Sequence, residues 1–149
     1  MSVIRITKYF SFEAAHILKN YDGPCSNLHG HSYRLAVTLR GAVEKNSDSP
    51  ESGMVMDFST LKNIVKDSIT SVFDHSLILN SYDFLSQADE IKKLSEKVIW
   101  VNYQPTCENM LADFAVRIKK HLAATVELFS LRLHETPTSY AEWYNEDNP

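Results

Sequence analysis

Three histidines near the start of the chain have a spacing that favours a metal site. His29 and His31 are two residues apart in the stretch CSNLHGHSY, so on a β-strand both rings project from the same face. His16 ends an earlier alternating stretch, and pairing of the two stretches as a hairpin would bring the three imidazoles together. Three histidines that leave one position open are typical of a catalytic zinc ion, whereas structural zinc sites have four protein ligands.

Ordinary hydrogen-bonded histidines are the alternative interpretation. It is the weaker one here, because the two neighbouring rings share their strand face with an apolar stripe, Tyr33 to Leu39. Burying an unpaired polar group costs a few kcal/mol, so each ring needs a partner, and a shared metal supplies one. Zinc is favoured over iron, because no carboxylate stands at the spacing expected of a facial triad.

A cysteine lies four residues before the first clustered histidine, and two roles fit it. Cys25 could be a fourth metal ligand, which would make the site structural. It could instead stand over the open position as a base or nucleophile, because a nearby cation lowers the pKa of a thiol. Cys107, in the first turn of an expected helix, is predicted to be structural. We expect no disulfide between them in a cytosolic chain.

Two acidic positions are further candidates. Asp74 precedes His75 and could orient its ring, although a cationic histidine at the end of a helix would also explain the pair. Glu135 shares the parity of Phe129 and two leucines, so it should face inward and needs a strong partner. No lysine or arginine is implied nearby, and a ligand with a paired N–H edge would satisfy the carboxylate. The alternative is that the strand turns Glu135 into solvent.

The elements that would position these groups follow an α+β plan with an antiparallel sheet. Alternation predicts strands over residues 4–16 and 29–39, then over residues 129–135 and 139–144. Between them, apolar residues at helical spacing predict one helix from an Asp57 N-cap to about Asp74, and another after a Thr106 N-cap. The order is therefore ββααββ, with four strands and two helices on one face. VIWV is compatible with a further short strand, and residues 82–97 read as a surface insertion.

Composition indicates one globular domain over residues 1–149, with a flexible tail at 145–149. The net charge of −4 argues against a broad nucleic-acid surface. No apolar run approaches the ~20 residues needed to span a bilayer, and the opening residues lack the pattern of a signal peptide. We therefore expect a cytoplasmic protein without nucleic-acid or membrane partners. The edges of a four-stranded sheet would need protection, for which oligomerisation is the usual remedy.

Taken together, these pieces resemble the 6-pyruvoyltetrahydropterin synthase / 6-carboxytetrahydropterin synthase family. The matching stretches lie in the family's order over residues 9–144 and are FEAAH, CSNLHGHSY, GMVMDF, FDHSLILN, QPTCEN and LHETPTSYAEW. The resemblance implies a tunnelling fold, in which four-stranded sheets join into a ring and two rings stack into a homohexamer. It also implies one zinc ion per subunit on His16, His29 and His31, with Cys25 as the residue that abstracts a proton.

The resemblance assigns roles to the remaining candidates as well. Asp74 and His75 would be the relay partners of the thiol, contributed by a neighbouring subunit. Glu135 would anchor a pterin ring, with Thr106 and Glu108 near the edge at which the ring binds.

The short interval between Cys25 and His29 looks like the bacterial carboxy-forming branch of the family. That branch would convert 7,8-dihydroneopterin triphosphate to 6-carboxy-5,6,7,8-tetrahydropterin, acetaldehyde and triphosphate in queuosine biosynthesis, a carbon–carbon lyase reaction. The alternative within the family is a pyruvoyl-forming enzyme, which eliminates triphosphate without cleaving a carbon–carbon bond. Outside it, the residues allow zinc-water hydration or hydrolysis, or a non-catalytic zinc-stabilised binding module with Cys25 as fourth ligand.

Overall fold

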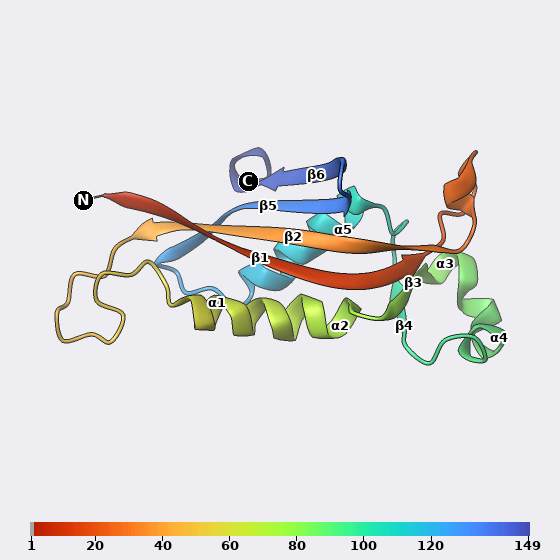
Figure 1. Cartoon of the computed structure of the whole chain (residues 1–149), viewed down its shortest axis with the longest axis horizontal. Helices are drawn as coiled ribbons and strands as arrows, with labels where there is room; N and C mark the ends of the chain where they lie inside the picture. The colour runs from red at the N-terminus through yellow and green to blue at the C-terminus, as the bar shows by residue number, and fades with distance from the viewer. Residues whose placement is uncertain (1) are drawn as a thin grey trace.

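The computed structural model describes residues 2–149 and is organised around one six-stranded sheet in the order β4-β3-β1-β2-β5-β6 (Figure 1). The strands are β1 Val3–His16, β2 His29–Ala42, β3 Ser76–Asn80, β4 Val98–Val101, β5 Val126–Thr136 and β6 Ser139–Tyr144. The helices are α1 Phe58–Val65, α2 Ser71–Phe73, α3 Ser81–Phe84, α4 Ala88–Lys92 and α5 Cys107–Lys119. Within residues 2–149, no helix combines the length and the apolar character needed to cross a membrane.

The expected hairpin at the start of the chain is present. β1 and β2 pair antiparallel along their whole length, from Val3 opposite Ala42 to His16 opposite His29. The same register sets Ala14 opposite His31. Because side chains alternate along each strand, the three histidines project from one face at the same end of the hairpin.

The prediction of a four-stranded antiparallel sheet is wrong. β3 pairs parallel with β1, and β4 pairs parallel with β3, so the sheet has six strands and is mixed. β3 was missed because its three central residues, Leu77–Leu79, are all apolar and show no alternation. A strand buried on both faces shows no period of two, and five residues are too few to separate it from the end of a helix. The short strand anticipated at VIWV exists as β4.

Helices cover the face of the sheet toward which the histidines point. Asp57 caps the first helical run, since its Oδ1 accepts a hydrogen bond from Ser59 N at 2.6 Å. α1 continues through a π-helical turn, Lys66–Thr70, into α2, so the run ends beside Asp74 as predicted. The fully buried residues of this helical run are spaced four apart. An α-helix has only about 3.6 residues per turn, and the wider π-helical turn helps to keep this spacing on one face. The buried residues are Leu61, Val65, Ile69 and Phe73.

α5 begins at the predicted cap and completes the cover. The Thr106 hydroxyl accepts from Asn109 N at 3.3 Å, and one apolar stripe of the helix enters the core. β5 departs from the predicted parity, because a bulge opposite Thr38 and Leu39 shifts its register. As a result, Leu128 is buried and Phe129 turns to the opposite face of the sheet. There the Phe129 ring lies under the guanidinium group of Arg5, with 4.1 Å between Arg5 Cζ and the ring centroid. After the bulge the alternation resumes and brings Glu135 to the histidine end of the sheet.

Candidate metal centre and catalytic residues

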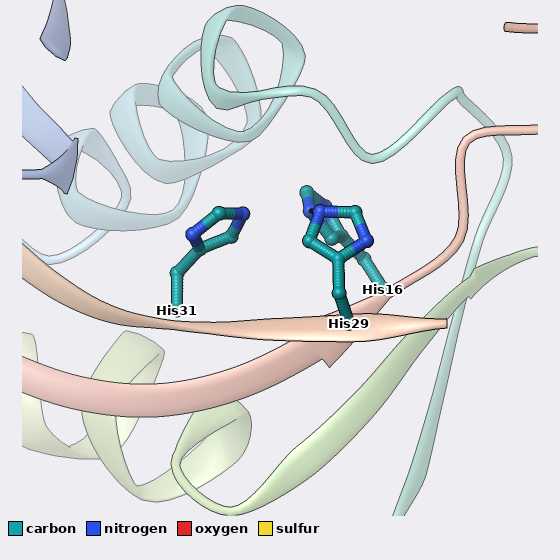
Figure 2. Close-up of side chains that lie close together, drawn as sticks. All are labelled: His16, His29 and His31. Atoms are coloured by element: carbon teal, nitrogen blue, oxygen red, sulfur yellow. Dashed lines mark hydrogen bonds between the residues drawn. The ribbon is translucent and has the colours of Figure 1, made fainter. Parts of the chain in front are cut away.

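Three imidazoles converge where β1 ends and β2 begins. In Figure 2, His16, His29 and His31 rise from the two strands toward the segment that leads into α5. One nitrogen from each ring lies within 4.8 Å of the others, and among residues 2–149 this is the group suited to hold a metal. His16 is buried and the other two rings are half-buried. The predicted metal site is therefore assembled within one chain.

Backbone carbonyls fix two of these rings in the tautomer that a metal requires. His16 Nδ1 donates to Pro105 O at 2.7 Å, and His29 Nδ1 donates to Asn27 O at 2.7 Å. Nε2 of each ring then presents a lone pair, and these two atoms lie 3.0 Å apart. Two lone pairs that face each other repel unless a cation lies between them. Such carbonyl partners are typical of histidine ligands.

His31 supplies the third nitrogen and has no hydrogen-bond partner in the part of the chain that the structure describes. Its Nε2 is buried and lies 3.6 Å from Glu135 Oε1. A buried polar atom without a partner is costly, and a metal ion would satisfy it. Burial also lowers the pKa of His31, and it lowers the pKa of His16 to about 4. Both rings are neutral near pH 7, so the three nitrogens fit a divalent ion such as zinc.

Glu135 borders the metal centre. Its Oε1 lies 3.6 Å from His31 Nε2 and 3.8 Å from His16 Nε2, and its side chain is 28% exposed. The inward orientation predicted from strand parity is therefore correct, but the nearest polar groups are the histidines. A carboxylate that is partly open to solvent beside three ligands can accept hydrogen bonds from a molecule bound at that position.

Cys25 lies outside the group of converging nitrogens. It is a free, half-buried thiol on the short helical turn Pro24–Ser26, and its carbonyl accepts from Leu18 N at 3.2 Å. The geometry thus gives no support to Cys25 as a fourth ligand. Cys107 is buried and donates to Leu133 O at 3.1 Å, and burial raises its pKa to about 12. Such a thiol is unreactive at neutral pH, in line with a structural role.

Asp74 and His75 form a hydrogen-bonded pair at the end of α2. His75 Nδ1 donates to Asp74 Oδ2 at 3.0 Å, which leaves Nε2 available on a side chain that is 78% exposed. Asp74 Oδ1 accepts from Glu13 N at 2.9 Å, and His75 N donates to Glu13 O at 2.6 Å. The bond from Glu13, followed by the one from His75, holds the pKa of Asp74 below its usual value. The orienting role proposed for Asp74 therefore has a structural basis.

The backbone of His75 is unusual. Its φ of 56° lies in the left-handed region, which glycine or asparagine normally occupies where a helix ends. Strain of this kind in a non-glycine residue points to a requirement for the side chain.

A hollow of about 640 Å³ lies beside His75, and neither His16 nor Glu135 lines it. Ala15, Gly30 and Ser32 line it and alternate with the metal ligands along β1 and β2, so it opens on the face of the hairpin opposite to the imidazoles. His29, His31 and His75 contribute to its wall, together with the apolar side chains Leu28, Ile91 and Leu94. A largely apolar wall with a few polar groups is typical of small-molecule sites. Asp74 is tied to Glu13 of β1, so the Asp74–His75 pair lies at the same end of the sheet as the histidines and Glu135, but the hollow does not join it to the imidazoles.

Thr106 and Glu108, the two residues expected near the bound ring, do not lie among the converging side chains. The Thr106 hydroxyl is engaged in capping α5, and Glu108 is exposed in the first turn of that helix. Sequence reasoning missed the carbonyls of Pro105 and Asn27, which hold the metal ligands. A backbone acceptor leaves no signal in residue type, although both residues flank predicted elements and could have been found by position.

Comparison with known proteins gives a consistent result. A family model described as 6-pyruvoyl tetrahydropterin synthase matches residues 5–146. A Haemophilus influenzae protein named 6-carboxy-5,6,7,8-tetrahydropterin synthase is 38% identical over 146 residues, covering 95% of this chain and 99% of its own. A Synechocystis protein of the same name is 34% identical, covering 94% of this chain and 92% of its own.

The fold also has a solved counterpart. A crystal structure of an uncharacterized Wolinella succinogenes protein superposes with a TM-score of 0.80 at 23% identity, covering 97% of this chain and 99% of that one.

Proposed function

The chain belongs to the 6-pyruvoyl tetrahydropterin synthase family, and we propose that it acts as a zinc-dependent 6-carboxy-5,6,7,8-tetrahydropterin synthase. Its substrates would be 7,8-dihydroneopterin triphosphate and one water molecule, and its products 6-carboxytetrahydropterin, acetaldehyde and triphosphate, an early step toward queuosine. The single observation that carries the proposal is full-length similarity to relatives with this activity in their names. The converging histidines support it, because they provide the metal centre that the chemistry needs.

The ring nitrogens of His16, His29 and His31 would hold the zinc ion. When bound, zinc supplies a Lewis acid that acidifies hydroxyl groups of the substrate side chain. Glu135 accepts hydrogen bonds from the N–H edge of the pterin ring and orients it against the ligands. This alignment of the reacting carbon contributes more to the rate than affinity alone would.

Proton transfer falls to Cys25 and His75. The Cys25 thiolate removes a proton from the side-chain carbon next to the ring, and His75 carries protons through Nε2. Asp74 keeps Nδ1 of that ring protonated, since it accepts the Nδ1–H bond at 3.0 Å. Thr106 and Glu108, at the start of α5, lie near the ring edge in this arrangement.

We also propose that the chain works as a homohexamer built from two stacked rings in the cytoplasm. Two features support an assembly. The exposed imidazole of His75 is open to a site on a neighbouring subunit. The outer edge of β6, which has six residues, is unpaired within residues 2–149, and strand edges of this kind join subunits.

The test is an incubation of purified zinc-loaded protein with 7,8-dihydroneopterin triphosphate, in which acetaldehyde and the pterin product are measured together. We expect acetaldehyde and 6-carboxytetrahydropterin in equal amounts. A pyruvoyl product without acetaldehyde would instead establish the second candidate, 6-pyruvoyltetrahydropterin synthase, the activity after which the matching family model is described. No turnover by a folded, zinc-bound protein would contradict both.

A further inference from the structure

Lys97 makes two hydrogen bonds to the turn that carries His75. Its Nζ donates to Asp74 O at 2.7 Å and to Ser71 O at 2.8 Å. Lys97 is half-buried and directly precedes β4, at the end of residues 82–97, the expected surface insertion. Its own carbonyl accepts from Leu77 N at 2.9 Å, which ties its backbone to β3. The lysine therefore joins the end of α2 to the sheet.

These bonds act on the peptide unit next to the imidazole. The last carbonyls of a helix lack partners within the helix, and a cation placed there is favourable. The Asp74 carbonyl belongs to the peptide that links Asp74 to His75, so the ammonium group fixes the plane from which the His75 side chain departs. The opposite side of the same turn is fixed by Glu13, through its N–H and its carbonyl.

The turn needs such restraint because His75 holds a left-handed backbone conformation. A residue with a Cβ keeps this conformation only where its surroundings over-determine it. If the Lys97 bonds were removed, the peptide between Asp74 and His75 could rotate toward a commoner conformation. The imidazole would then move relative to the Asp74 carboxylate, and the 3.0 Å bond that selects its tautomer would weaken.

We propose that Lys97 is a positioning residue, which orients the His75 imidazole and its tautomer by clamping the carbonyls of Ser71 and Asp74. This inference rests on the proposed function in so far as His75 transfers protons there. It gives residues 82–97 a role, because the segment ends in the group that holds the turn. Lys97 itself need not touch substrate.

The experiment compares Lys97→Met, which keeps the length and loses the donors, with Lys97→Arg, which restores charge and donors. Lys92→Met is the matched control, because Lys92 is exposed and no side-chain hydrogen bond or ion pair is recorded for it within residues 2–149. Two readouts are taken on the zinc-loaded protein: steady-state kinetics with 7,8-dihydroneopterin triphosphate, and ¹⁵N spectra of the His75 ring, which report the tautomer without turnover.

We expect Lys97→Met to lower kcat about 10- to 100-fold with little change in KM, the loss typical of a misplaced catalytic group. Its His75 ring should shift from the Nδ1–H toward the Nε2–H tautomer. Lys97→Arg should recover much of the rate and the tautomer, and Lys92→Met should match the wild type. A purely structural lysine would lower stability in Lys97→Met while folded protein kept its kcat and its His75 spectrum, and that result would overturn the proposal.

The two proposals fail separately. If the wild type does not turn over, the proposed function is wrong, and the ¹⁵N spectra still decide whether Lys97 orients the imidazole. If the wild type turns over and Lys97→Met equals it in both readouts, Lys97 has no positioning role. Should Lys97→Met not fold, Lys97→Gln retains a neutral donor and should give an intermediate kcat and tautomer ratio; wild-type values in that variant would count against the proposal.

Discussion

His16 and His29 occupy opposite positions in the β1–β2 register, and their Nε2 atoms lie 3.0 Å apart. Because Nδ1 of each ring is committed to a backbone carbonyl, the short distance brings together two lone pairs. The hairpin thus holds an arrangement that is unfavourable without a cation. The register of two paired strands is in this way directly linked to metal binding.

Replacement of His31 should abolish this binding. The variant His31→Leu loses one of three nitrogens and places an apolar group at an atom that has no hydrogen-bond partner, so its metal-free form should remain folded. The wild type should gain about 4 kcal/mol in free energy of unfolding at zinc concentrations about 1,000 times Kd, and the variant almost none. Thermal unfolding with and without zinc measures the difference. His121→Leu, an exposed position outside the cluster, is the control. An equal zinc effect in His31→Leu would refute the site.

The metal-free protein should lose stability as the pH falls below about 6.5. Burial lowers the pKa of His16 to about 4 in the folded state, whereas the unfolded chain has an ordinary value near 6.5. Between these two pKa values the unfolded state binds more protons than the folded state. The contribution of His16 to the free energy of unfolding is therefore complete above pH 6.5 and is lost as the pH falls toward 4. The loss should be on the order of 3 kcal/mol.

Urea unfolding in chelator between pH 7 and 4.5 measures this loss. In the variant His16→Leu, the free energy of unfolding should depend less on pH. The pKa of His31 is also lowered, so replacing His31 as well should weaken this pH dependence further. A wild-type profile as flat as that of the double variant would contradict the assignment.

The predictable parts of this fold were those encoded by neighbouring residues. Alternation in β1 and β2 has a period that is readable over fourteen residues each, so the hairpin and the common face of His16, His29 and His31 followed from local pattern. The caps at Asp57 and Thr106 were likewise visible, because capping depends on a side chain and the next few N–H groups.

The parts that were missed depend on contacts between distant segments. The central residues of β3, Leu77–Leu79, are all apolar because both faces of this strand are buried, and the bulge that moves Phe129 arises from pairing with Thr38 and Leu39. The clamp by Lys97 joins residues 23 positions apart through main-chain carbonyls, which look alike in every sequence. Residue types therefore predicted the ligands better than the groups that hold them in place.

Substitution of Cys25 should separate catalysis from metal binding. Cys25→Ala should lower turnover about 10²- to 10⁴-fold, the usual contribution of a general base, because the other cysteine, Cys107, is buried and cannot replace it. Zinc content should stay at one ion per chain, since the sulfur is not among the converging ligand atoms. Zinc analysis and turnover are measured on the same preparation. Loss of zinc together with activity would make Cys25 a ligand instead.

Glu135→Gln should weaken the pterin complex and leave the metal centre intact. The amide has the size of the carboxylate but lacks its charge and presents a donor where an acceptor is needed, so bidentate pairing with an N–H edge is lost. Pterin affinity, measured by fluorescence titration, should fall at least about tenfold, in line with the loss of a charged hydrogen bond. Zinc affinity should change little, because Glu135 Oε1 lies 3.6 Å and 3.8 Å from the two nearest ligand nitrogens. Unchanged pterin affinity with weakened zinc binding would reassign the carboxylate to the metal.

The strain at His75 should reverse the usual order of alanine and glycine. His75→Ala and His75→Gly both remove the imidazole and should both abolish turnover. At ordinary helical positions alanine is more stable than glycine by about 1 kcal/mol. At the φ of 56° that His75 adopts, a Cβ costs roughly 1–2 kcal/mol, so His75→Gly should be the more stable variant. Urea unfolding of both variants gives the sign of the difference. A more stable alanine variant would show that the turn relaxes once the histidine is removed, and that no strain is held there for the sake of the side chain.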